Sequence, residues 1–222
     1  MELEVKNKIQ KILNAVETGK PEGDYGCLSI FDDGPNRIKQ ITYGKSQTTE
    51  WGNLKKLIAL YIDKNGRYSK DFSVYLPKLG VHSLVGDSVF LDLLKKASFD
   101  PVMKSSQDEF FDEHYWKPAL KWFCSNSFCL NLSMLVIYDS FIHSGSILKF
   151  LRNSFAEKVP LHGGDEKKWI LNYTKNRHDW LRFHINKDLV KSSYRTKDML
   201  RTIEAEDWDL KNPYNANGQI IT

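Results

Sequence analysis

Two carboxylic side chains near the start of the chain, Glu17 and Asp33, have the chemistry that acid–base hydrolysis needs. Glu17 ends an amphipathic stretch, and Asp33 lies in the turn-forming segment Asp32-Asp33-Gly34-Pro35. A carboxyl at a helix end can face a carboxyl on a following turn. When two carboxyls lie about 6.5–9.5 Å apart, one can protonate the leaving oxygen of a glycosidic bond while the other takes a proton from water. At such a separation the pair would suit inverting glycoside hydrolysis.

Ordinary structural roles compete with this interpretation. Glu17 could be an exposed residue at a helix end, although helix C-termini favour cations and a glutamate there is electrostatically unfavourable. Asp33 could serve only the turn, because Asp, Gly, Pro and Asn are typical turn residues. Asp32 is the rival base, since neighbouring residues at a strand end point to opposite faces and only one of them can face a cleft.

A helix and a β-hairpin are the elements that must position the two carboxyls. Apolar side chains recur at helical spacing over residues 5–17, and Gly19 and Pro21 end this helix. Residues 25–31 and 38–44 are rich in apolar and β-branched side chains, and the turn between them carries Asp33. The sequence thus predicts one carboxyl at a helix end and one on a hairpin turn.

The rest of the chain has the apolar spacing of helices. We expect further helices over residues 54–63, 72–79, 87–97, 101–111, 115–138, 147–155, 166–184 and 196–203, and an irregular tail at 208–214. Residues 115–138 are the candidate central helix, joining two lobes. The uncharged run 122–138 contains several Ser and Asn residues, which favours a buried helix over a membrane span. Many helices with one small N-terminal sheet predict an α+β fold, mostly α.

Length and charge limit the possible functions. The 222 residues can bury a sizeable core, and we expect residues 1–222 to form a single, two-lobed, monomeric catalytic domain. A net charge of +4 without a Lys/Arg-rich run argues against nucleic-acid binding. The first residues lack the apolar core of a signal peptide, so the sequence leaves the compartment open. We expect neither a nucleic-acid nor a membrane partner.

Motifs for cofactors and metals are missing from the sequence. The chain contains no GxGxxG, P-loop, HExxH or GxSxG pattern. Its three cysteines, Cys27, Cys124 and Cys129, include no CxxC pair, which argues against a disulfide scaffold or a zinc site. We therefore expect no cofactor and no metal.

Six short stretches form an ordered set over roughly residues 9–221. They are Ala15-Val16-Glu17, Asp33-Gly34, residues 107–119, Tyr138-Asp139 with His143-Ser144-Gly145, Gly163-Gly164-Asp165-Glu166 followed by Arg177, and Asp209-Leu210-Lys211-Asn212-Pro213. In this order and spacing the set resembles the chitosanases of glycoside hydrolase family 46, within the lysozyme-like superfamily. The resemblance implies two mostly helical lobes flanking a cleft with a small sheet at its edge.

The same resemblance implies roles for individual residues. Glu17 would be the general acid and Asp33 the general base. A charged network behind the acid would consist of Asp139, Arg177 and Arg201, with Arg195 as a possible substitute. Buried Arg–carboxylate pairs would fix the side-chain positions and would tune the pKa of the general acid.

The residues expected to bind substrate are Thr42, Glu50, His143 and Asp165. The family's Gly-Tyr-Thr-Gly after its base is replaced here by Arg37-Ile38-Lys39-Gln40, so Thr42 is the nearest threonine that could help to hold the attacking water. Glu50 lies near the position of a substrate-binding acid in the family. Arg37 and Lys39 would repel a polyglucosamine, so the resemblance supports the fold and the acid–base pair more strongly than the polymer.

Two classes of function follow. The leading one is an inverting endo-glycosidase acting on a β-1,4-linked aminosugar polymer, with chitosan first and peptidoglycan or partly acetylated chitin second. The competing one is a non-catalytic glycan-binding protein on the same scaffold. In both cases the partner is a polysaccharide, and the resemblance implies an extracellular protein.

Overall fold

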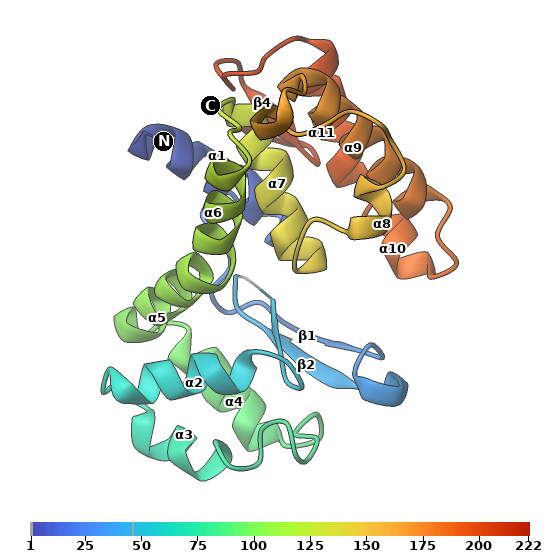
Figure 1. Ribbon diagram of the computed structural model, residues 1–222. Helices are drawn as coiled ribbons and strands as arrows, with labels where there is room; N and C mark the ends of the chain where they lie inside the picture. The colour runs from blue at the N-terminus through green and yellow to red at the C-terminus, as the bar shows by residue number, and fades with distance from the viewer. Residues whose placement is uncertain (1, 46) are drawn as a thin grey trace. The chain divides into compact units, whose positions relative to one another are not determined.

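The structure is a computed structural model that describes residues 2–45 and 47–222. The chain divides into two compact units (Figure 1). Unit 1 comprises Met1–Glu22 and His114–Thr222, and unit 2 comprises Gly23–Glu113. Glu17 therefore belongs to unit 1 and Asp33 to unit 2.

Helix α1, Leu3–Thr18, carries Glu17 in its last turn. Its apolar residues Ile9, Ile12 and Leu13 are fully buried, so the predicted helical spacing does form one core-facing stripe. Gly19 ends the helix with a φ of 73°, and its N–H donates to the carbonyl of Ala15 at 2.9 Å. A left-handed cap of this kind favours glycine, which explains why α1 ends at Thr18, one residue after Glu17.

The core of unit 1 is built around α7, Asn131–Ser144, in which every residue from 132 to 141 is buried. Helix α7 contacts α1, α6 (Lys117–Ser125), α9 (Glu166–Arg182) and α11 (Tyr194–Glu204), and Figure 1 shows it between α6 and α9. A helix that is apolar on all sides must be surrounded by protein, as its sequence predicted.

The single helix expected over residues 115–138 is wrong. The structure has a π-helical turn η2 (Asp112–Trp116), then α6, a break at 126–130, and then α7. Asn126 donates from Nδ2 to the carbonyl of Trp122 at 2.8 Å, and Ser127 adopts a φ of 60°. Asn and Ser side chains compete for backbone hydrogen bonds and so can end a helix. All of residues 115–138 lie within unit 1, so this segment does not join the two units.

The remaining elements of unit 1 are short. They are α8 (Lys149–Arg152), η3 (Pro160–His162), α10 (Lys187–Lys191), β4 (Tyr214–Ala216) and β5 (Gln219–Ile221). Strands β4 and β5 pair antiparallel and contact α1. The prediction that strands occur only near the N-terminus was therefore wrong. The hairpin turns at Asn217-Gly218, both with positive φ, and Asn-Gly is a common turn pair in such hairpins.

Unit 2 contains the small N-terminal sheet. Its strands are β1 (Leu28–Phe31), β2 (Gln40–Tyr43) and β3 (Thr48–Thr49), antiparallel in the order β1-β2-β3. The register places Phe31 opposite Gln40 at the end that leads into the turn with Asp33. The sheet is tied to the helices by Tyr43, whose hydroxyl donates to the carbonyl of Leu94 at 2.9 Å.

Among the described residues of unit 2 there are also a 3-10 turn, η1 (Pro35–Arg37), and four α-helices. The α-helices are α2 (Leu54–Asp63), α3 (Ser69–Tyr75), α4 (Ser88–Ala97) and α5 (Pro101–Phe111). The rings of Tyr61, Phe72 and Phe90 form a buried chain of edge-to-face contacts, with centroids 5.5 and 6.2 Å apart. These buried aromatic contacts form part of the hydrophobic core of unit 2.

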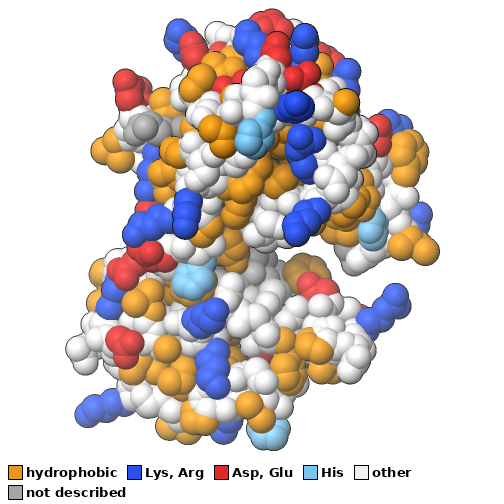
Figure 2. Space-filling model, viewed as in Figure 1, with side chains coloured by type: hydrophobic (Ala, Val, Ile, Leu, Met, Phe, Trp, Pro, Cys, Tyr) orange, Lys and Arg blue, Asp and Glu red, His pale blue; other side chains and the backbone are white. Residues whose placement is uncertain are grey.

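The fold class is confirmed as α+β, mostly helical, with a small antiparallel sheet near the N-terminus. Figure 2 shows Lys and Arg side chains scattered among apolar and uncharged ones over the face in view, without a single basic patch. In the part of the chain that the structure describes, no helix is long and apolar enough to cross a membrane.

Candidate active site

Glu17 is held at the end of α1 by a side chain that comes from far along the sequence. Its Oε1 lies 2.6 Å from Nη2 of Arg195, and the Glu17 side chain is only 17% exposed. The preceding residue is fixed too, because the Tyr194 hydroxyl donates to the carbonyl of Val16 at 2.6 Å. Two consecutive residues of α11 thus hold two consecutive residues of α1. The cation also offsets the unfavourable position of a glutamate at a helix C-terminus.

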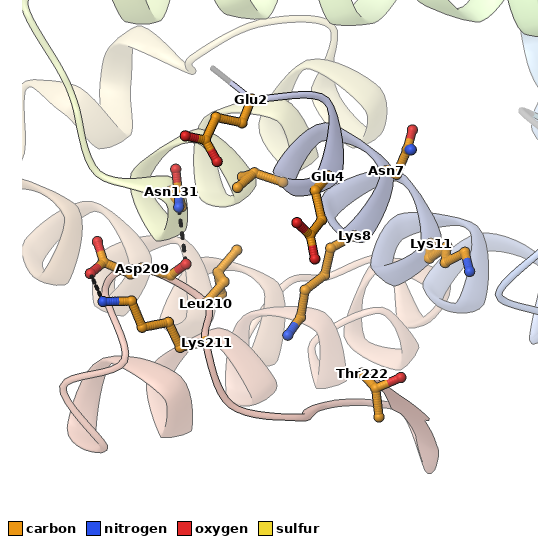
Figure 3. Close-up of a pocket in the computed structure, with 11 residues that line it drawn as sticks. Glu2, Glu4, Asn7, Lys8, Lys11, Asn131, Asp209, Leu210, Lys211 and Thr222 are labelled. Carbon is orange, nitrogen blue, oxygen red and sulfur yellow. Dashed lines mark hydrogen bonds and ion pairs between the residues drawn. The ribbon is translucent and has the colours of Figure 1, made fainter.

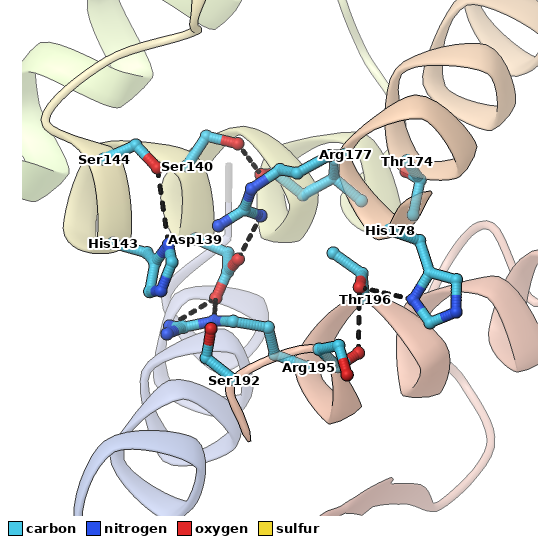
Figure 4. Close-up of polar contacts among 12 residues, drawn as sticks. Asp139, Ser140, His143, Ser144, Thr174, Arg177, His178, Ser192, Arg195 and Thr196 are labelled. Atoms are coloured by element: carbon cyan, nitrogen blue, oxygen red, sulfur yellow. Dashed lines mark hydrogen bonds and ion pairs between the residues drawn. The ribbon is translucent and has the colours of Figure 1, made fainter. Parts of the chain in front are cut away.

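Arg195 links Glu17 to a fully buried ion pair. Its Nε and Nη2 lie 2.9 and 2.7 Å from Oδ1 of Asp139, and Asp139 also pairs with Nη1 of Arg177 through Oδ2 (Figure 4). Asp139 and Arg177 are 0% exposed and Arg195 is 4% exposed. These four residues, Glu17, Arg195, Asp139 and Arg177, are called the charged network below. Two carboxyl groups alternate with two guanidinium groups in it, and the buried carboxylate of Asp139 contacts both arginines.

The charges within the network set its protonation state. Burial by itself would raise the pKa of the Asp139 carboxyl, but Arg195 and Arg177 beside it hold that pKa at about 2. Burial would likewise lower the pKa of Arg195, but the carboxylates of Asp139 and Glu17 outweigh burial and raise it. Asp139 is therefore ionised and Arg195 is cationic at neutral pH.

His143 follows Asp139 by one helical turn on α7 and lies beside the two arginines. Burial, together with the positive charges of Arg195 and Arg177, lowers the pKa of His143 to about 3, although Asp139 opposes the shift. Its Nδ1 lies 3.4 Å from the Ser144 hydroxyl. His143 is therefore a neutral imidazole at ordinary pH. As a predicted substrate-binding residue it could offer hydrogen bonds but no charge.

Arg201, the arginine that the resemblance named first, lies elsewhere. It pairs with Asp198 on its own helix, and its side chain is 52% exposed. Six residues of an α-helix turn through about 600°, so Arg195 and Arg201 cannot share a face of α11. The network arginine is thus the substitute, Arg195, and the expectation for Arg201 is corrected.

Asp33 lies in the loop between β1 and β2 of unit 2 and is exposed. Its Oδ1 accepts a hydrogen bond from Nε2 of Gln40 at 2.8 Å. Gln40 is the first residue of β2 and is only 5% exposed. Asp32 is also exposed, but it is Asp33 that this buried amide holds. Asp33 is thus reachable by solvent and yet anchored through one carboxylate oxygen.

Glu50 was expected to bind substrate, and the structure contradicts that expectation. It is 0% exposed, and its carboxylate accepts from the backbone N–H groups of Ile41 at 3.1 Å and Leu84 at 2.5 Å. A buried carboxylate that accepts backbone hydrogen bonds serves the fold, because it ties β2 to the segment before α4. Glu50 therefore has a structural role within unit 2.

Thr42 and Asp165 also have structural positions. Thr42 lies in the middle of β2 and is 4% exposed, and its buried hydroxyl has no hydrogen-bond partner among the described residues. A group that holds an attacking water must reach that water, so Thr42 does not fit the expected role. Asp165 is the N-cap of α9, where its carboxylate accepts from the N–H of Lys168 at 3.0 Å. Capping accounts for this aspartate without any contact to substrate.

Within the described ranges, no group of three or more His, Cys, Asp or Glu side chains could hold a metal ion. Unit 1 also has a groove of about 590 Å³ along the first turns of α1 (Figure 3). Its lining mixes Glu2 and Glu4 with Lys8 and Lys11, and nearby Lys211 pairs with Asp209 at 2.9 Å. This mixed lining does not select one ligand charge.

Sequence reasoning missed two residues of the site, Gln40 and Tyr194. Nothing in the type or spacing of Tyr194 marks it, because its partner Val16 is 178 residues away. For Gln40 there was a signal. A hairpin around the turn at residues 32–37 brings the first residue of the second strand close to the end of the first strand.

Known proteins provide an independent comparison with this geometry. The sequence model of glycosyl hydrolase family 46 matches residues 18–214. A curated chitosanase of Bacillus subtilis (strain 168) is 28% identical over 238 residues, which cover 97% of this chain and 80% of the relative. Solved structures also resemble the fold, among them two of chitosanases.

The first structure is a complex of the GH46 chitosanase of Gynuella sunshinyii with chitotetraose, at a TM-score of 0.83 and 22% identity, covering 99% of this chain and 97% of that one. The second is the native chitosanase of Bacillus subtilis MY002, at a TM-score of 0.82 and 21% identity, covering 100% of both chains. At these identities the likeness is one of fold, and it extends over the whole chain.

Proposed function

The chain belongs to glycosyl hydrolase family 46, and from this premise we propose that it cleaves chitosan, a β-1,4-linked glucosamine polymer, within the chain and with inversion. It is a glycoside hydrolase, so the non-catalytic alternative is not favoured. Chitosan is the polymer to test first, because the curated relative and the structural neighbours are all chitosanases.

The observation that supports the acid assignment is the contact of Arg195 with Glu17, backed by buried Asp139 and Arg177. A protein keeps buried charges at a cost in desolvation, so such a network calls for a specific role. Fixing Glu17 in one position is such a role, since proton transfer to a leaving oxygen requires hydrogen-bond distance. We assign Glu17 as the general acid on this ground.

In the proposed reaction Asp33 is the general base. Asp33 takes a proton from a water molecule, whose oxygen attacks the anomeric carbon on the face opposite the leaving group. The bond between the anomeric carbon and the glycosidic oxygen breaks, and Glu17 transfers its proton to that oxygen. The products are an α-configured reducing end and a free hydroxyl group, and exchange with solvent restores both carboxyls.

Product analysis tests this proposal directly. The protein is incubated with chitosans of graded acetylation, chitin and peptidoglycan, and fresh products are followed by ¹H NMR. We expect glucosamine oligomers from chitosan, with the α-anomer formed first. Oligomers released from chitin or peptidoglycan alone would assign a different polymer, and a first-formed β-anomer would exclude the inverting mechanism.

The Asp33 loop makes the acetylation series informative. Arg37 and Lys39 are both exposed on this loop, and a fully deacetylated chain is cationic. Like charges disfavour close approach, so we expect turnover to tolerate some acetylated, neutral units.

We further infer that the enzyme acts as a monomer, because one chain supplies both carboxyls and the partners that hold them. Light scattering at assay concentration checks this.

A further inference from the structure

Gln40 is placed to control the side chain of Asp33. Its Nε2 donates to Oδ1 of Asp33 at 2.8 Å, and its Oε1 accepts from the backbone N–H of Trp51 at 3.3 Å. Because an N–H group can only donate, the oxygen of the amide must face Trp51 and the NH₂ group must face Asp33. The backbone of Trp51 thus fixes which end of the Gln40 amide the carboxylate meets.

The conformation of the loop that carries Asp33 brings this side chain close to the amide of Gln40. Asn36 and Arg37 have φ values of 56° and 60°, the geometry of a tight hairpin turn, and the N–H of Ile38 donates to the carbonyl of Pro35 at 3.2 Å. Gly34 closes the loop with an N–H that donates to the carbonyl of Ile38 at 3.0 Å.

A Cβ at Gly34 would lie 2.6 Å from the Ile38 oxygen and 3.3 Å from Cδ1 of Trp51. The chain therefore requires glycine directly after Asp33. Asparagine adopts the left-handed conformation comparatively readily, but arginine does so rarely, so the φ of 60° at Arg37 is enforced by its surroundings. The loop, the turn and the buried amide together allow Asp33 little freedom.

We propose that Gln40 is the positioning residue of the general base, an inference that rests on the assignment of Asp33 under the proposed function. Gln40 holds one carboxylate oxygen of Asp33 and leaves the second to accept the proton of the attacking water. The neutral amide holds that oxygen by a hydrogen bond without placing a permanent charge beside it. In this chain Gln40 lies where the resemblance marked a departure from the family pattern, in the segment 37–40.

The test exploits a second buried glutamine with the same architecture. Gln107 is 2% exposed, its Oε1 accepts from the N–H of Lys45 at 3.0 Å, and its Nε2 donates to the carbonyl of Tyr25 at 2.9 Å. Gln40→Glu and Gln107→Glu each keep the acceptor oxygen and replace the donor by a second oxygen. Gln40→Leu removes the donor without adding charge.

The test compares kcat and KM on a glucosamine hexamer, together with the thermal unfolding midpoint, between the parent protein and each variant. Gln40→Glu and Gln40→Leu should lower kcat by about 10- to 100-fold with little change in KM, since small misplacements of a reacting group cost up to about 10²-fold. Gln107→Glu should lower the midpoint comparably but leave kcat near the parent value. In an Asp33→Asn background, Gln40→Leu should cause no further loss.

Two results would overturn the inference. One is a kcat in both Gln40 variants that matches Gln107→Glu. The other is a full additional loss from Gln40→Leu in the Asp33→Asn background, which would mean that Gln40 acts independently of Asp33. If the parent cleaves no glucosamine oligomer, the proposed function fails. A crystal structure of Gln40→Leu then decides the positioning role separately, because an unmoved Asp33 side chain would contradict it.

Discussion

The two carboxyls proposed for catalysis are held by chemically different partners. In unit 1, Glu17 contacts Arg195, which in turn contacts the buried pair of Asp139 and Arg177. In unit 2, Asp33 meets a single neutral amide, Gln40. Glu17 is mostly buried and lies on a helix, whereas Asp33 is exposed and lies on a loop.

The difference follows from solvent access. A carboxyl withdrawn from water needs charged partners to offset desolvation, and its partners then need partners of their own. An exposed carboxylate keeps its hydration and needs only an anchor for its orientation. Disrupting the charged network should therefore lower both the unfolding free energy and kcat. Breaking the contact between Gln40 and Asp33 should act chiefly on kcat.

The largest expected effect comes from changing the carboxyls themselves. Glu17→Gln removes the transferable proton and Asp33→Asn removes the base, so kcat on a glucosamine hexamer should fall by roughly 10²–10⁴ in each, with substrate binding retained. Asp32→Asn is the matched control and should be mild. Full activity of Glu17→Gln would exclude Glu17 as the acid, and a severe loss in Asp32→Asn would move the base to Asp32.

Arg177→Ala tests whether the charged network of unit 1 contributes to the free energy of unfolding. It leaves Asp139 buried without one of its cations, and loss of one partner of a buried pair typically costs about 3–5 kcal/mol of unfolding free energy. Urea unfolding measures this cost. Lys211→Ala, which breaks an exposed pair in the same unit, should lower the unfolding free energy far less, because solvent screens an exposed ion pair. Equal costs for the two variants would contradict a folding role for the network.

Two groups, Asp139 within the charged network and His143 beside it, should contribute to the acid dependence of stability. The unfolded chain binds a proton at His143 from about pH 6.5 downward, whereas the folded protein does so only near pH 3. Protons therefore favour the unfolded state in that range, and stability falls as pH falls from about 6.5 to about 3. Asp139 has a folded pKa of about 2, below its ordinary 3.8, so it removes stability as pH falls from about 4 to about 2.

Unfolding midpoints between pH 7 and pH 4 test the contribution of His143. His143→Gln should flatten the fall of the midpoint with decreasing pH, because the proton-binding group is gone. His82→Gln changes an exposed histidine of unit 2 and serves as the control. An unchanged slope in His143→Gln would show that other groups cause the acid dependence.

The smallest expected effect is that of Tyr194→Phe. It removes the hydroxyl that donates to the carbonyl of Val16, next to Glu17, and one hydrogen bond contributes about 0.5–1.5 kcal/mol. Tyr173→Phe is a sharp control, because its buried hydroxyl has no hydrogen-bond partner among the described residues. Urea unfolding should show a lower unfolding free energy for Tyr194→Phe and an unchanged one for Tyr173→Phe. A lower unfolding free energy in Tyr173→Phe alone would contradict a stabilising role for the Tyr194 hydroxyl.

Local sequence alone determined the elements that carry the two carboxyls. The spacing of Ile9, Ile12 and Leu13 predicted α1, and Gly19 predicted where it ends. Turn residues around Asp33 predicted the hairpin. These features depend on neighbours a few positions away, because helical periodicity, caps and turns are set by backbone geometry.

Only the tertiary structure decided which side chains meet. Arg195 and Arg201 are both arginines of one helix, and the packing of α11 against α1 and α7 selects Arg195. Glu50 looked like a substrate-binding acid until its carboxylate proved to be buried against the backbone of Ile41 and Leu84. Such contacts join residues up to 178 positions apart. They depend on how helices and strands are oriented in the core, and no local pattern of residue types encodes that orientation.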